Sequence, residues 1–215
     1  MSIFVSIKQI FIKKKILHCI LFAVVPALLF YGISFLWLRK VGFSPMEILR
    51  DPAQQSGQSN FLGFLSNIGI WLWVSSFAIC FYSATIKAIV IKNSKRELLV
   101  LLGILSLILA VDDFFMIHDR HGSEKLMYLL YAFFACSLLL RHYKTIIEVD
   151  GFAFLLAGFL LALSIATDVY QAKIFSSYKF SQVFEEGFKF IGAGIWLYFC
   201  CRVGLLHGKE KETVV

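Results

Sequence analysis

Long apolar runs separated by short polar stretches make up most of the chain, and the first run begins near residue 16. A helix that crosses a membrane needs about 20 consecutive, mostly apolar residues. The predicted spans are residues 16–38, 64–90, 97–117, 126–140, 151–168 and 184–206. The pattern therefore predicts an all-α fold: a polytopic transmembrane helix bundle with six spans, which forms a single integral membrane domain over residues 1–215.

The run at 126–140 is the shortest of the predicted spans. Lys125 and Arg141 flank it directly. Both side chains can lay their aliphatic stems along apolar surroundings while their charges reach the polar interface. We therefore expect this short run to cross the membrane with the help of its two flanking residues.

The longest connection between predicted spans covers residues 39–63 and contains the sequence SPMEILRDP. In it, Ser44 is followed by Pro45 and, three residues after the serine, by Glu47. This spacing is typical of a capping box, in which the serine and glutamate side chains accept hydrogen bonds from each other's backbone N–H groups. Proline is favoured at the first helical position. The loop is therefore predicted to contain a short helix on the outer side of the membrane.

The composition supports a membrane protein, because 59% of the residues are hydrophobic and only 16% are charged. Soluble domains carry about 25% charged residues. The net charge is +7, but Lys and Arg lie mainly at the ends of the apolar runs and are more numerous on the side that would hold both termini. An excess of these residues is typical of the cytoplasmic side. We expect cytoplasmic termini, the lipid bilayer of a bacterial cytoplasmic membrane as the main partner, and no nucleic acid.

The cysteines are Cys19, Cys80, Cys136, Cys200 and Cys201. All of them lie in apolar runs, and none has the spacing of a metal site. Free cysteine behaves as a small hydrophobic residue and is commonly buried. We therefore expect buried thiols and neither a disulfide framework nor a thiolate metal centre.

Acidic residues recur near the outer ends of three predicted spans. At about 1.5 Å per residue, Asp112 and Asp168 lie about 24 and 26 Å above the inner ends of their spans. Glu185 and Glu186 lie at a similar height, about 24–26 Å above Arg202. The predicted binding cluster comprises Asn67, Asp112, Asp113, Asp168, Glu185, Glu186 and Lys189. We expect this cluster toward the extracytoplasmic face.

Lys189 lies one turn deeper in the membrane than Glu185, where an ionised lysine is costly unless it is paired. Its expected partners are Glu185, Glu186, or an aspartate of the third or fifth span. An alternative interpretation treats the acidic residues as ordinary interfacial groups. In that interpretation the two glutamates lie in the first turn of the last span, where the positive end of the helix dipole stabilises carboxylates.

The stretch VDDFFMIHDRH, residues 111–121, adds two histidines to this region. On a straight helix Asp112 and Asp113 point about 100° apart, and His118 points about 120° or more from either. The histidines can therefore join the aspartates only if the helix breaks near His118. The candidate ligands for a divalent cation, Zn²⁺ or Ca²⁺, are Asp112, Asp168, His118 and His121.

Three kinds of function are compatible with these residues. The cluster can be structural or bind a cation, in a homo-oligomer or in a subunit that pairs with a membrane partner. It can also belong to a metal-dependent hydrolase that acts on lipid at the outer leaflet, with Glu185 or Glu186 as the catalytic general base. A third possibility is a component of proton- or cation-coupled transport. We favour the structural or cation-binding role.

Overall fold

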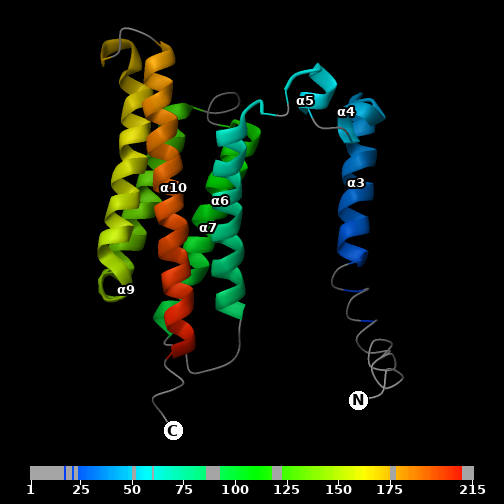
Figure 1. Ribbon diagram of the computed structural model, residues 1–215. Helices are drawn as coiled ribbons and strands as arrows, with labels where there is room; N and C mark the ends of the chain where they lie inside the picture. Colours follow the sequence, from blue (N-terminus) through cyan, green and yellow to red (C-terminus); the bar gives the residue numbers. More distant parts are fainter. Residues whose placement is uncertain are drawn as a thin grey trace, which may run out of the picture. The chain divides into compact units, whose positions relative to one another are not determined.

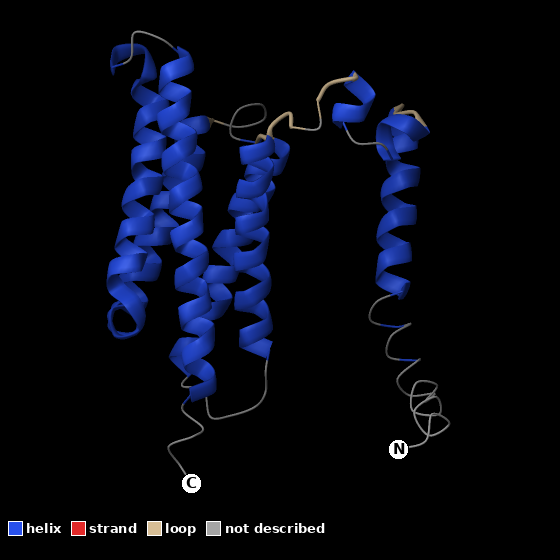
Figure 2. Ribbon diagram, in the orientation of Figure 1, coloured by secondary structure: helices blue, strands red, loops and turns tan. Residues whose placement is uncertain are grey.

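The structure is a computed structural model that describes residues 24–49, 52–59, 61–85, 93–117, 123–174 and 178–209, together with Leu17 and Leu21. Within these ranges the chain is helical and has no strand, as the all-α prediction requires (Figure 2). Contacts divide the chain into two compact units, Met1–Leu62 and Gly63–Val215. The acidic residues singled out in the sequence belong to the second unit.

The first unit contains α3 (Val25–Val41), α4 (Pro45–Leu49) and α5 (Pro52–Ser56). α3 extends beyond the predicted end of the first span and ends at Gly42, whose φ of 113° is a left-handed conformation. Glycine adopts this conformation without the strain that a Cβ would cause. The Gly42 N–H donates to the Arg39 carbonyl at 3.1 Å, which satisfies one of the last carbonyls of the helix.

The predicted capping box is present at the start of α4. The Ser44 backbone N–H donates to Glu47 Oε2 at 2.7 Å, and the Glu47 backbone N–H donates to Ser44 Oγ at 3.2 Å. Pro45 is the first residue of the helix. The short helix predicted in the loop 39–63 is therefore confirmed, and so is its start.

This cap should make α4 sensitive to acid. The hydrogen bond from the Ser44 backbone lowers the pKa of the Glu47 carboxyl below its ordinary value of 4.5. A lowered pKa means that the carboxylate stabilises the helix above pH 4.5, and that this contribution is lost as the pH falls through the lowered pKa. We expect the hydrogen-exchange protection factors of α4 amides to drop in that acidic window. Glu47→Gln should show no such drop; equal pH dependence in both proteins would contradict the prediction.

The second unit contains α6 (Phe64–Thr85), α7 (Asn93–Phe115), α9 (Glu124–Ile174) and α10 (Tyr178–Lys209) (Figure 1). Four helical stretches of the described chain are long and apolar enough to cross a membrane: Phe64–Thr85, Lys95–Phe115, Lys125–Tyr170 and Ser181–Leu205. Because a lipid environment requires backbone hydrogen bonds within each segment, such helices indicate an integral membrane protein.

α9 folds back on itself and contains two of the predicted spans. Its backbone leaves helical geometry at His142 (φ −117°, ψ 18°) and at Asp150 (φ −172°, ψ 78°). Tyr128, near the start of α9, donates a hydrogen bond to Asp168, near its end, at 2.7 Å. The two parts are therefore antiparallel neighbours, and Figure 1 shows the turn between them. We call residues 124–141 the first arm and residues 151–174 the second arm.

Asp150 helps to begin the second arm. Its Oδ1 accepts the backbone N–H of Ala153 at 3.1 Å, in the manner of an N-cap, and its Oδ2 accepts the Tyr198 hydroxyl of α10 at 3.3 Å. Such a cap satisfies one of the free N–H groups that every helix start leaves. A polar residue between two apolar runs thus both separates the arms and links the second arm to α10.

Buried aromatic residues form the centre of the second unit. Phe154 lies between Trp196 and Phe199, with ring centroids 5.7 and 5.3 Å away. The Trp196 indole N–H donates to the Ser106 hydroxyl at 2.9 Å, which joins α10 to α7. Among the described cysteines, Cys80 and Cys200 are fully buried, whereas Cys136 is exposed, so the prediction of buried thiols holds for only some of them.

The second arm and α10 approach closely at Gly192. A methyl group added there would lie 3.0 Å from Leu161 Cγ and 3.4 Å from the Ala157 carbonyl oxygen. Small residues allow such close approach between helices in membranes. Gly192 thus permits the close spacing of two helices that carry residues of the candidate site.

Candidate functional site

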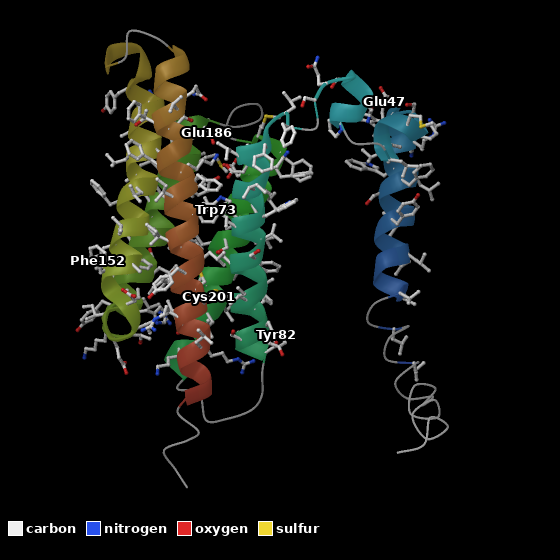
Figure 3. All side chains as sticks on the ribbon, in the orientation of Figure 1. Glu47, Trp73, Tyr82, Phe152, Glu186 and Cys201 are labelled. Atoms are coloured by element: carbon white, nitrogen blue, oxygen red, sulfur yellow. The ribbon has the colours of Figure 1, made fainter. Side chains whose placement is uncertain are left out.

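Asp113 joins three helices near the C-terminal end of α7. Its Oδ1 lies 2.7 Å from the Lys189 ammonium of α10, and its Oδ2 accepts the Trp73 indole N–H of α6 at 3.0 Å. The Asp113 side chain is 10% exposed and that of Lys189 29% exposed. Of the partners that the sequence suggested for Lys189, Asp113 is therefore the one that forms the ion pair. Figure 3 labels Trp73 and Glu186 on the two helices that flank this contact.

Asp112 is only 3% exposed, and it lines the same cavity as its neighbour Asp113. Adjacent positions on a helix point about 100° apart, so both can border one cavity only if it lies between their two directions. Asp113 meets α6 and α10, and Asp112 faces toward the arms of α9. The sequence predicted that the two side chains point in different directions, but not that both line one cavity.

The second arm contributes Asp168, which accepts the Tyr128 hydroxyl of the first arm at 2.7 Å. Tyr131 lies three residues further along the first arm, on the same helical face as Tyr128. Its hydroxyl oxygen is buried and lies beside the Asp112 carboxylate of α7. Sequence reasoning missed both tyrosines. Their spacing, and their distance from Lys125 at the end of the span, were the signals that could have identified them.

These side chains border one cavity of about 200 Å³ between α6, α7, α10 and the two arms of α9. Its polar lining consists of Asp112, Asp113, Tyr128, Tyr131, Ser164, Asp168, Glu185 and Lys189. The rest of its lining is apolar or aromatic. A mostly apolar pocket with a few converging polar groups is typical of a small-molecule binding site.

The two glutamates of α10 have different surroundings. Glu185 lines the cavity and accepts a hydrogen bond from Gln182 Nε2 at 2.7 Å. Glu186 borders a smaller recess together with Ser66, Asp113 and Lys189. The prediction that both lie in the first helical turn is wrong, because α10 begins at Tyr178 and has no acidic residue in its first turn. The helix dipole therefore does not explain them.

Asn67 is not brought to the cavity. It is exposed on α6, and the residues of α6 that border the cavity or the recess are Leu65, Ser66, Gly69 and Trp73. One position along a helix turns the side chain by about 100°, so Asn67 faces away from the direction of Ser66. Its position along α6 places Asn67 at the level of the cavity, but its side chain points in another direction.

The structure gives no support to a metal centre within its described ranges, where no group of three or more His, Cys, Asp and Glu is arranged to hold an ion. His118 and His121, the two histidines of the predicted ligand set, lie outside the described residues. α7 ends at Phe115, and Met116 has a positive φ of 49°, so the helix stops before His118.

Residues 18–203 match a family described as a domain of unknown function, DUF8692. The chain belongs to this family. The DUF8692 match includes every residue that lines the cavity, so the candidate site is part of the family's domain. No curated protein and no solved structure matches the chain.

The charges around the cavity of this DUF8692 protein are unequal. Four carboxylates border it, from Asp112, Asp113, Asp168 and Glu185, and among the lining residues the cationic side chain is Lys189. Lys189 contacts Asp113 directly. Carboxylates in an apolar environment need hydrogen-bond or charge partners, because ions lose their hydration there. The arrangement can therefore hold a positively charged group or share protons among its carboxyl groups.

Proposed function

We propose that this DUF8692 protein is a six-span protein of a cytoplasmic membrane, with both termini in the cytoplasm, that binds a cation in the cavity. The two ends of α7 support this topology, because Lys95 lies near its start and Asp112 near its end. Arg141 lies near Lys95, because its guanidinium is 2.7 Å from Glu97. Lys and Arg gather on the cytoplasmic side of membrane proteins, which supports an extracytoplasmic position for the acidic cavity.

The convergence of carboxylates from several helical segments on one cavity carries this proposal. Ionisable residues within membrane segments are expensive and typically serve ion sites or pair with each other. Asp113 and Lys189 form such a pair and hold α7 to α10, which is a structural role. Asp112, Asp168 and Glu185 border the same space from three different segments, and we assign cation binding to them.

Cation-dependent stability of the purified protein tests this function. A ligand that binds only the folded state at one hundred times its Kd raises the free energy of unfolding by about 2.7 kcal/mol. Thermal melting in a neutral detergent at low ionic strength should rise with at least one of K⁺, Ca²⁺, Zn²⁺ or methylammonium. The rise should be lost in Asp168→Asn, since that variant removes one carboxylate from the cavity.

Asp150→Asn is the matched control, because Asp150 is also in α9 but borders the turn between the arms rather than the cavity. It should keep the full response to the cation. If no cation raises the melting temperature of the wild type more than that of Asp168→Asn, cation binding in this cavity is overturned.

A further inference from the structure

The cavity continues from its acidic end into an apolar part that an inorganic ion cannot fill. Along α7 the lining runs from Leu105 through Leu109 to Asp112, which is about 10 Å of helix. On α10 it runs from Trp196 to Glu185, about 16 Å. On both helices the carboxylate stands at one end and the apolar residue at the other. The space thus has a polar end and an apolar body.

Small residues of the two arms create this apolar part. Ala132 and Ala135 of the first arm and Gly158 and Ala162 of the second arm line it. The spacing of Gly158 and Ala162 suggests close helix packing, but a methyl group added at Gly158 would meet no heavy atom within 4 Å. This contrasts with Gly192, where such a group would press on Leu161. Gly158 therefore leaves open space in the apolar part of the cavity and does not form a close helix contact.

The volume and the polarity of the cavity limit which ligands can bind in it. An apolar cavity of about 150 Å³ is large enough to bind benzene. The present cavity, of about 200 Å³, takes a body of that size and leaves room for a small polar head. At the polar end, carboxylates accept hydrogen bonds, and the Tyr131 hydroxyl beside Asp112 can accept or donate one as well.

We infer that the cation of the proposed function is an organic ammonium ion with an apolar body of about benzene size. Its N–H groups donate to Asp112, Asp168 and Glu185, and its apolar body lies between α7 and the arms beside Gly158. A phosphate next to the amine would be repelled by the same carboxylates, so the ligand carries none. This inference rests on the proposed function and extends it from the charge of the ligand to its class.

A homologous series of probes tests the inference on the full chain in neutral detergent. The probes are methylammonium, butylammonium, hexylammonium and phenethylammonium, and binding is measured from the shift of the melting curve. Each buried methylene should lower Kd about fourfold until the apolar part is full, at about six carbons. Hexanol and phosphatidylethanolamine, each added to the same detergent micelles, are the comparison ligands, and neither should reproduce the shift given by hexylammonium.

Gly158→Leu should fill the apolar part, so that hexylammonium binds no better than methylammonium while methylammonium keeps its wild-type Kd. Ala162→Leu fills the same space from one turn away and serves if Gly158→Leu does not fold. Gly32→Leu in α3 is the control, because a side chain there also meets no atom within 4 Å but does not line the cavity. It should leave the whole series unchanged.

The outcomes separate the two proposals. If hexylammonium binds no better than methylammonium in the wild type, or if the inorganic ions bind and no ammonium does, the organic ligand is overturned and the cation site stands. Protection by phosphatidylethanolamine equal to that by hexylammonium overturns the phosphate-free class. If no probe and no inorganic ion binds, the proposed function itself is overturned.

Discussion

Replacing Lys189 with methionine should lower the free energy of unfolding by about 3–5 kcal/mol, the range seen when one partner of a buried ion pair is removed. Methionine keeps the length of the apolar stem but removes the charge that lies 2.7 Å from Asp113. The Asp113 carboxylate, 10% exposed, would keep the Trp73 indole N–H as a donor but lose its counter-charge. Equilibrium unfolding in mixed detergent micelles measures the loss.

A more exposed ion pair, between Arg141 and Glu97, is the matched control. Arg141 and Glu97 also lie 2.7 Å apart, but their side chains are 65% and 41% exposed. Exposed pairs contribute only about 0–1 kcal/mol, so Arg141→Met should have a small effect. Equal losses in Lys189→Met and Arg141→Met would mean that burial of the Asp113 pair does not matter.

A double variant distinguishes the effect of removing one charge of the pair from the effect of removing both. Lys189→Met combined with Asp113→Asn removes both charges, while the asparagine oxygen can still accept from Trp73. Removing both members of a buried pair is often far less costly than removing one. The double variant should therefore recover most of the stability lost in Lys189→Met. Measuring Asp113→Asn alone completes the cycle that gives the coupling energy between the two residues.

The sequence was most informative where local chemistry decides the structure. Apolar runs become helices because lipid leaves the backbone no other way to satisfy its hydrogen bonds, and the four long apolar helices agree with this. The capping box at Ser44 and Glu47 depends on residues three apart, so it could be recognised without any tertiary contact. In both cases the interaction lies within one segment.

The candidate site depended on contacts between segments, and there the sequence was less informative. Counting residues gives the height of a side chain along a helix, which placed Asp112, Asp168 and Glu185 at similar levels. It does not give the rotation of each helix, which packing sets. For this reason Asn67 was included although it faces away, and Tyr131 was omitted although it lines the cavity.

Helix ends caused a second kind of error. α10 begins at Tyr178, six residues before the predicted start of its span, because polar residues such as Lys179 and Gln182 continue the helix beyond the apolar run. Hydropathy marks the part of a helix that suits the membrane, whereas hydrogen bonding determines where the helix ends. Glu185 and Glu186 therefore lie within α10, where the first-turn explanation of their charge does not apply.

Trp196→Ala should lower the free energy of unfolding by about 3–5 kcal/mol, as large-to-small changes of buried aromatic residues do. Trp196 is 3% exposed, contacts Phe154 and Phe199, and donates to Ser106 at 2.9 Å. Alanine would leave a void between α7, the second arm and α10, and the atoms around it would lose their dispersion contacts. Those contacts are a main source of helix association in membranes.

Trp71→Ala is the same substitution at a position 64% exposed on α6, and it should cost much less. Trp196→Phe keeps most of the ring but removes the donor to Ser106, and it separates packing from hydrogen bonding. A polar contact between membrane helices contributes on average about 0.6 kcal/mol, so Trp196→Phe should fall much closer to the wild type than Trp196→Ala. The reverse order would show that the hydrogen bond, and not the packing of the indole, holds α10 to α7.

Because Trp196 also lines the cavity, Trp196→Ala should enlarge its apolar part and shift the preferred ammonium probe to a longer chain, which a purely structural tryptophan would not do.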